Sequence, residues 1–303
     1  MGSTATLLLE DSEVYGLVHS TFRRVVNISL PGNKLISISR SDVSNSPTNI
    51  VTDLSSVEDY WKYEIRPDMT VSVKDNVMRL GSLFINLAEA TRWTPAIYKK
   101  LTGLSLTQIS SNISLLARWA DNLPNPYGLA CFIPHTSALL AGDFNMPFCS
   151  DPFLEIAFSA ITGLCRSLQR ADLMGLRENT AKLIGLGPGL TPSGDDFLAG
   201  LIASLIYTQK ITNQPKSFPI QGLCNTVCDL ARTRTNDISR QLLTFAAKGE
   251  VPETMETLIL AVLTKPDTEL ELAARQLTNV GASSGSDQLL GIFLGISLYF
   301  HRS

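Results

Sequence analysis

The apolar pattern of the chain changes character near Thr94 and Pro95. Before this point, short segments rich in Val, Ile, Ser and Thr alternate with turn residues such as those of 31-PGN-33. Runs of β-branched residues between turns are typical of strands, and strands at this spacing predict a small antiparallel barrel or sandwich. The expected strand segments are 14–20, 22–30, 34–40, 48–52, 70–76 and 77–87.

After Pro95 the apolar residues recur at helical spacing. Several of these segments begin with Asp, Asn, Ser or Thr, whose side chains can accept from free backbone amides at a helix start. The expected helical segments are 106–123, 152–172, 222–232, 236–249, 253–264 and 267–280. The predicted fold class is therefore α+β, with a β-rich N-terminal domain at 1–92 and a larger, mainly helical domain at 93–303.

Charge and apolar runs exclude several classes of protein. The formal net charge is −3 and no basic block is present, which argues against a nucleic-acid partner. The longest apolar runs, 197–207 and 289–300, fall short of the roughly 20 residues that span a bilayer. The first residues, MGSTATLLLEDSEVYG, have no cationic region and do not resemble a signal peptide. We expect a soluble, cytoplasmic protein with no membrane partner.

One glycine-rich stretch, 185-GLGPGLTPSGDDFLAG-200, has part of the spacing of a phosphate-binding loop. Gly189 and Gly194 match that loop, but Asp195 and Asp196 stand where Lys and Ser or Thr are needed. Two carboxylates repel the phosphates of a nucleotide, so the stretch does not predict nucleotide hydrolysis.

The same stretch predicts the start of a helix. Thr191 or Ser193 could cap it, and its free amides could hold a small anion. The two aspartates have two possible roles. Their negative charges could stabilise the helix by interacting with the positive end of its dipole. Alternatively, one of them could bind a substrate amide or a divalent cation such as Mg²⁺ or Mn²⁺.

A second stretch, 281-GASSGSDQLLGIFLGISL-298, repeats the pattern S-G-x-D-x-L-x-G. Both copies are followed by small residues at a spacing of four, which permits close approach between helices. We therefore expect two helices side by side, with their starts opening on one site. The matched pairs are Ser193 and Ser284, Gly194 and Gly285, Asp196 and Asp287, and Gly200 and Gly291.

The candidate site combines these two stretches with 232-RTRTNDISRQLL-243, where cationic and hydroxyl side chains precede a helix. Two alternatives stay open: Asp and Ser at a helix start are often only caps, and the arginine segment is equally typical of an exposed loop. The expected catalytic residues are Asp195, Asp196 and Asp287, of which Asp196 and Asp287 are also the expected metal ligands. The expected anion-binding residues are Gly187, Gly189, Thr191, Ser193, Gly194, Arg232, Thr235, Ser239, Ser283, Ser284 and Gly285.

The glycine-rich stretch resembles the signature G-x-G-x-G-L-T-P-S-G-D-D-x-L-x-G of a bacterial family that includes the H subunit, AllH, of catabolic oxamate carbamoyltransferase. The segment RTRTNDISRQLLTFAAKGE resembles the next block of that family. ASSGSDQLLG resembles its G-H-S-S-G-x-D block, with Ala282 where a histidine is frequent. The resemblance covers most of the helical part and is diffuse in the first hundred residues.

The resemblance implies a subunit of an enzyme of allantoin and purine degradation that converts oxalurate and phosphate to oxamate and carbamoyl phosphate. It also implies two further protein subunits, one of them similar to acyl-CoA synthetase proteins. Two other classes remain. The chain could be a non-catalytic structural or regulatory subunit whose glycine turns lock two helices, or a small-molecule or metal-binding protein unrelated to carbamoyl transfer.

Overall fold

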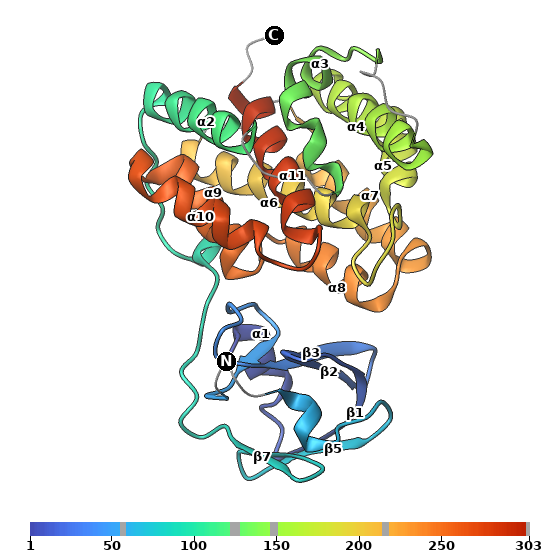
Figure 1. Cartoon of the computed structure of the whole chain (residues 1–303), viewed down its shortest axis with the longest axis vertical. Coiled ribbons are helices and arrows are strands. Elements are labelled where there is room, and N and C mark those ends of the chain that lie inside the picture. The colour runs from blue at the N-terminus through green and yellow to red at the C-terminus, as the bar shows by residue number, and fades with distance from the viewer. Residues whose placement is uncertain (55–58, 122–127, 146–150, 214–217, 301–303) are drawn as a thin grey trace. The chain divides into compact units, whose positions relative to one another are not determined.

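The computed structural model describes residues 1–54, 59–121, 128–145, 151–213 and 218–300. The chain forms two compact units, Met1–Tyr98 and Lys99–Ser303 (Figure 1). The order of their elements, strands first and helices after, confirms the predicted fold class.

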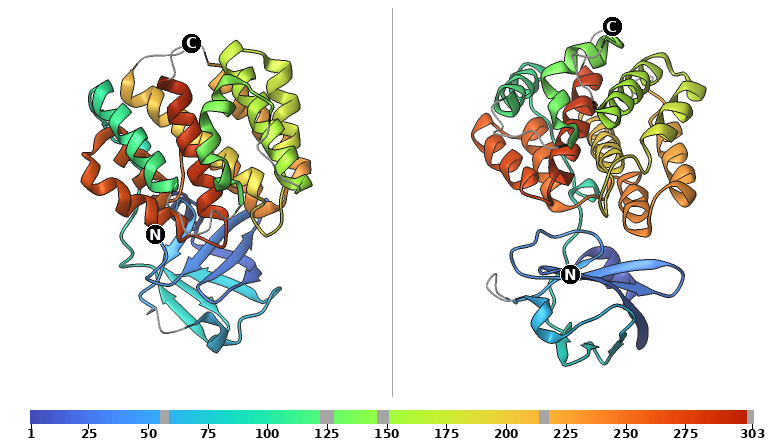
Figure 2. Two further views of the ribbon diagram at one scale, coloured as in Figure 1. Left: turned by 45° about the horizontal axis from the view of Figure 1, so that its top comes forward. Right: turned by 45° about the vertical axis from the view of Figure 1, so that its right-hand side comes forward.

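The first unit is a seven-stranded sheet that curls into a half-barrel (Figure 2). Its strand order is β4-β3-β2-β1-β5-β6-β7, and every neighbouring pair is antiparallel except β3 and β4. The predicted strand 77–87 is two strands, because Gly81 adopts a φ of +57° and turns the chain between them. The elements are α1 (Ser3–Leu8), β1 (Glu13–Thr21), β2 (Val25–Leu30), β3 (Lys34–Ser39), β4 (Asn49–Val51), η1 (Tyr60–Tyr63), β5 (Thr70–Lys74), β6 (Val77–Leu80), β7 (Leu83–Asn86) and η2 (Ala96–Tyr98).

One face of this sheet forms the core of the first unit. Along β2 the buried residues Val26, Ile28 and Leu30 alternate with more exposed ones, as the two-residue period of a strand requires. Val18 from β1 and Met78 from β6 complete the same apolar layer. The first unit therefore has a hydrophobic core of its own.

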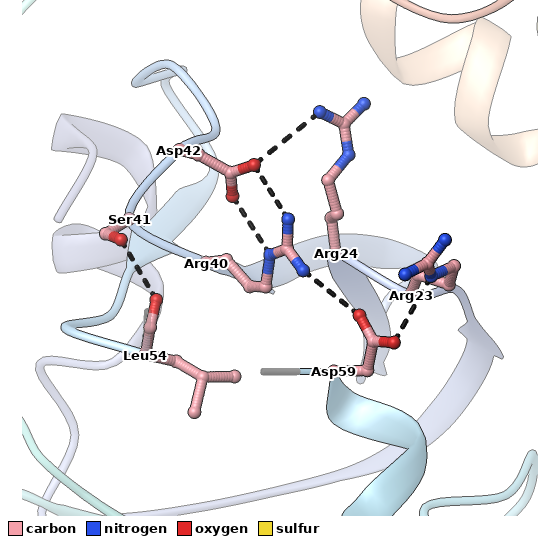
Figure 3. A network of polar contacts seen from close by, with 7 residues as sticks. All are labelled: Arg23, Arg24, Arg40, Ser41, Asp42, Leu54 and Asp59. Carbon is pink, nitrogen blue, oxygen red and sulfur yellow. Dashed lines mark hydrogen bonds and ion pairs between the residues drawn. The ribbon is translucent and has the colours of Figure 1, made fainter. Parts of the chain in front are cut away.

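A buried arginine joins two loops of the first unit (Figure 3). The guanidinium of Arg40 donates two hydrogen bonds to Asp42, at 3.0 and 2.7 Å, and one to Asp59 at 3.0 Å. Arg23 pairs with Asp59 at 3.2 Å, and Arg24 lies 3.8 Å from Asp42. The bonds from Arg40 hold the pKa of Asp42 below its usual value. The paired geometry suits arginine, whose planar fork matches a carboxylate.

The second unit is helical throughout the described residues. Figures 1 and 2 show α11 running through its middle beside α6. The predicted helix 152–172 ends at Ala171, which has a φ of +53°, and the separate helix α5 follows with Asp172 as its cap. The elements are α2 (Leu106–Asp121), η3 (Gly128–His135), α3 (Thr136–Ala141), α4 (Pro152–Arg170), α5 (Leu173–Leu183), α6 (Ser193–Thr212), α7 (Ile220–Arg234), α8 (Asp237–Ala246), α9 (Glu253–Thr264), η4 (Asp267–Glu269), α10 (Leu270–Thr278) and α11 (Ser284–Phe300).

The helices α6 and α11 each start against the end of the helix before them. A side chain on Gly194 would overlap the carbonyl oxygen of Leu183, the last residue of α5. In the same way, a side chain on Gly285 would overlap the carbonyl oxygen of Leu277 near the end of α10. The sequence repeat is therefore a repeat of structure, in which a helix, a turn and a buried helix occur twice.

No helix among the described residues is both long and apolar enough to cross a membrane.

Candidate functional site

The two repeated helices pack against each other through reciprocal contacts. A side chain on Gly200 of α6 would overlap the carbonyl oxygen of Gln288 on α11, and a side chain on Gly291 would overlap that of Phe197 on α6. Gly200 and Gly291 are equivalent positions of the repeat, and so are Phe197 and Gln288. A local twofold axis therefore relates the two contacts. The helices run parallel and start together, which confirms the predicted packing. We call this contact the α6–α11 seam.

Two carboxyl groups lie at the start of the seam. Asp196 and Asp287 are in equivalent positions of the repeat, and neither has any exposed surface. Oδ1 of Asp196 accepts from Nε2 of Gln288 at 2.8 Å, and Oδ1 of Asp287 accepts from the backbone amide of Leu129 at 2.5 Å. The second oxygen of each, Oδ2, is buried and has no hydrogen-bond partner among the described residues. Each carboxyl group is thus half satisfied.

Hydroxyl groups cross the seam between the two copies. The side chains of Thr191 and Ser284 are hydrogen-bonded to each other at 2.8 Å, and both hydroxyls lower the pKa of Asp196. Ser193, the equivalent of Ser284, lowers the pKa of Asp287. The serine of each copy therefore lies near the aspartate of the other copy.

Burial makes both carboxyl groups weak acids. It raises the pKa of Asp196 to about 6 and that of Asp287 to about 7, since the protein interior disfavours the charged form. The charge of Asp196 raises the pKa of Asp287 further. Near neutral pH the pair holds fewer than two negative charges and attracts groups that bring protons or positive charge.

Asp195 has different surroundings from its neighbour Asp196. Its Oδ1 accepts from the amide of Gly185 at 2.9 Å, and its Oδ2 accepts from the hydroxyl of Thr235 at 2.5 Å. Burial raises the pKa of Asp195, whereas Thr235, Gly185 and Ser239 lower it. Asp195 therefore ties the glycine-rich turn to the connection between α7 and α8.

The glycine-rich turn, residues 185–192, offers free backbone amides. Gly187 and Gly189 have φ values of +110° and +100°, which glycine adopts readily. Within the described part of the chain, the amides of Gly187, Gly189, Leu190 and Thr191 have no acceptor. An anion beside this turn would therefore meet unoccupied N–H donors.

The helix ends themselves offer fewer donors than the sequence predicted. The amides of Asp195 and Asp196 donate to the carbonyl of Pro192, and that of Asp287 donates to Ser283. The cap expected from Thr191 or Ser193 is absent, because Pro192 holds the capping position and no side chain caps α6. Gly194 and Gly285 likewise donate to carbonyl groups of the turns before them.

The arginine segment is brought only partly to the seam. Thr235 reaches Asp195, and Ser239 is buried beside it. Arg232 is exposed on the last turn of α7. The next arginine, Arg234, donates to the carbonyl of Ala181 on α5 at 3.0 Å and so joins the end of α7 to α5.

Two partners of the carboxyl groups were not predicted. Gln288 directly follows Asp287 in the second copy, and its long polar side chain inside a buried helix was the available signal. The donor to Asp287 is the backbone amide of Leu129 at the start of η3, far away in the sequence. A backbone amide carries no signal in the sequence, so only the fold could reveal it.

A metal ion would find an incomplete set of ligands here. In the described parts of the chain, no group of three or more His, Cys, Asp and Glu side chains could hold one. The two seam carboxylates and the hydroxyls near them are oxygen ligands of the kind that Mg²⁺ and Mn²⁺ prefer. Such an ion would need further ligands from a substrate or water.

Comparison with known proteins gives a family but no structural relative: no solved structure matches the chain significantly. A family model described as oxamate carbamoyltransferase subunit AllH matches residues 183–296, which include the glycine-rich turn and both copies of the S-G-x-D pattern. A second model, the AllH family N-terminal domain, matches residues 2–92, where the sequence resemblance was diffuse. The chain belongs to the AllH family.

Proposed function

We propose that this chain is a subunit of an enzyme that transfers a carbamoyl group between oxamate and phosphate in allantoin breakdown, with the reaction site at the start of the α6–α11 seam. The observation that carries the proposal is the half-satisfied pair Asp196 and Asp287 beside a turn with free amides. Buried polar groups are normally satisfied, and exceptions concentrate at functional sites. The family description supplies the kind of reaction.

The reaction needs donors for an anion and a group that moves a proton. An oxygen of phosphate attacks the carbamoyl carbon of oxalurate, the bond from that carbon to the oxamate nitrogen breaks, and the nitrogen takes up a proton. The products are carbamoyl phosphate and oxamate. The amides of Gly187 and Gly189, with the hydroxyls of Thr191 and Ser193, would hold the phosphate.

The proton would come from the seam. A carboxyl group whose pKa is about 7 is well matched to proton transfer at neutral pH, and Asp287 has such a pKa. Asp195 would keep the glycine-rich turn in place through Gly185 and Thr235. Ser239, Ser283, Ser284 and the glycines Gly194 and Gly285 would shape the site. If Mg²⁺ or Mn²⁺ takes part, Asp196 and Asp287 would hold it, and it would neutralise charge on the phosphate. Two further protein subunits would complete the enzyme.

A structural subunit is the competing function, and the reciprocal glycine contacts favour it. Gly200 and Gly291 let the two helices approach closely whether or not any ligand binds. In that case Asp196 and Asp287 would have no part in the chemistry.

The test is carbamoyl phosphate formation by the complete enzyme, purified with its partner subunits. We expect the rate to fall by about 100-fold or more when Asp287→Asn replaces the wild-type chain, which corresponds to about 3 kcal/mol of transition-state stabilisation. Asp229→Asn is the matched control, because Asp229 is half exposed and pairs with Arg177 on the surface of the helical unit. Full activity of both Asp287→Asn and Asp196→Asn in the assembled enzyme would contradict the proposal and favour a structural role for the chain.

A further inference from the structure

The start of the α6–α11 seam holds two buried carboxyl groups that are not fully hydrogen-bonded. Oδ2 of Asp196 and Oδ2 of Asp287 are both buried, and both lack a donor among the described residues. A buried carboxylate oxygen without a donor is strongly unfavourable when charged. A ligand that suits this place must therefore bring donors or positive charge, and an anion alone does neither.

The nearby side chains favour an N–H group over a metal ion. Among the described residues no histidine, cysteine or third acidic side chain completes a metal site with the two aspartates. The hydroxyls of Thr191 and Ser284 are already bonded to each other. Each of the two carboxyl groups still has one oxygen, Oδ2, that can accept a hydrogen bond from a ligand.

The symmetry of the pair narrows the choice further. Asp196 and Asp287 occupy equivalent positions on either side of the local twofold axis that relates Gly200 and Gly291. A planar –NH₂ group also has two N–H bonds, which diverge from one nitrogen. It can donate one hydrogen to each of two acceptors that face it from opposite sides.

We infer that the α6–α11 seam binds the –NH₂ end of the carbamoyl group of carbamoyl phosphate, with one N–H donated to Asp196 and the other to Asp287, which is a carboxylate once it has given its proton to oxamate. The inference rests on the proposed function and deepens it. It makes these two residues the ones that select a carbamoyl group over other acyl groups of the same size. The phosphate end of the ligand would then lie toward the amides of Gly187 and Gly189.

The ligand would enter beside the glycine-rich turn. Both carboxyl groups are closed off from solvent, whereas Pro188, Gly189 and Leu190 in the middle of the turn are exposed. The hydrogen bond between Thr191 and Ser284 joins this turn to α11.

Carbamoyl phosphate and acetyl phosphate are the matched probes, because they differ by –NH₂ against –CH₃ and carry the same phosphate. Calorimetric titration of the full chain, in the presence of a chelator, should show that carbamoyl phosphate binds about 10- to 100-fold more tightly than acetyl phosphate, the size of a hydrogen bond to a charged group. Asp196→Asn and Asp287→Asn should each reduce this ratio to near one. The asparagine can place its own –NH₂ where Oδ2 stood and repel the ligand.

The ratio of the two affinities distinguishes loss of –NH₂ recognition from damage to the fold, because a distorted site would weaken the binding of both probes by the same factor. Asp229→Asn should keep the wild-type ratio. Four results would each overturn the inference. The wild-type chain could bind both probes equally or bind neither. The preference for carbamoyl phosphate could survive both seam substitutions, or it could appear only with Mg²⁺. These outcomes leave the proposed function standing if the assembled enzyme still forms carbamoyl phosphate and loses that activity in Asp287→Asn.

Discussion

Asp195 and Asp196 are adjacent in one motif, yet the fold gives them opposite surroundings. Both oxygens of Asp195 accept hydrogen bonds from the protein, from Gly185 and Thr235. Asp196 has one satisfied oxygen and one that has no donor among the described residues. The difference arises because successive residues of a helix face directions about 100° apart. One aspartate then points to the α7–α8 connection and the other to the seam.

The half-satisfied pair predicts an unusual dependence of stability on pH. Burial raises the pKa of Asp287 to about 7 in the folded protein, above about 3.9 in an unfolded chain. Between these values the folded protein binds more protons than the unfolded chain, so this group's contribution to the free energy of unfolding falls as pH rises. Removing the charge by Asp287→Asn should therefore stabilise the protein at alkaline pH relative to wild type.

Urea unfolding at several pH values measures this effect. The stability of Asp287→Asn relative to wild type should be about 3 kcal/mol greater at pH 8 than at pH 4, and Asp196→Asn should behave in the same direction. Asp229→Asn, at an exposed position, serves as the control for the loss of a surface carboxylate. A constant difference between Asp287→Asn and wild type across this range would mean that Asp287 is not held in its neutral form by burial.

At the scale of elements, the sequence predicted the central pair of helices but not everything around them. The repeated S-G-x-D pattern and the glycines at a spacing of four predicted parallel helices in close contact. The separate helix α5 was missed because the break is a single alanine, Ala171, in a left-handed conformation that alanine seldom adopts. Tertiary packing rather than local preference sets that boundary.

The strand region shows the same limit. Alternating β-branched residues predicted most strands within a few residues, since the pattern follows directly from burial of one face. The order of the strands was not predicted. It depends on pairings such as the parallel contact between β3 and β4, for which no short turn gives a signal.

The reciprocal glycine contacts predict a strong effect of one added methyl group. Gly291→Ala would place Cβ against the carbonyl oxygen of Phe197, a backbone atom that cannot move without shifting α6. We expect a loss of about 2 to 4 kcal/mol in the free energy of unfolding, at the upper end of the usual cost of overpacking. Gly200→Ala should cost a similar amount, because it stands in the equivalent position.

Gly222→Ala on α7 is the control for helix preference. Its Cβ would meet a side-chain methyl of Leu173 at 3.1 Å, which can move, and alanine favours a helix over glycine by up to about 1 kcal/mol. We expect this variant to lie within about 1 kcal/mol of wild type in urea unfolding. If Gly291→Ala were equally mild, the two helices could separate at no cost, and the close seam would lose its physical basis.

At the scale of the whole molecule, the chain is two compact units with different kinds of core. The first packs Val26, Ile28 and Met78 beneath a curled sheet, whereas the second buries nearly all of the first half of α6. The change in apolar pattern near Pro95 predicted this division of character. The partner of Asp287 could not be predicted from the sequence, because Leu129 reaches Asp287 through a backbone amide.

Separate cores predict separate unfolding. Each unit buries its own apolar residues, so each should unfold as a cooperative transition of its own in calorimetry of the full chain. Arg40→Ala tests the assignment of the first transition. It leaves Asp42 without the two hydrogen bonds from Arg40 and Asp59 without one, and so should lower the melting temperature of the sheet unit. Arg40→Lys keeps the charge without the paired geometry, so its melting temperature should fall between those of Arg40→Ala and wild type.

Gly291→Ala tests the second transition. It should lower the melting temperature of the helical unit and leave that of the sheet unit unchanged. A single transition that both substitutions lower by the same amount would mean that the two units unfold together, and that a substitution in the sheet unit also changes the stability of the seam.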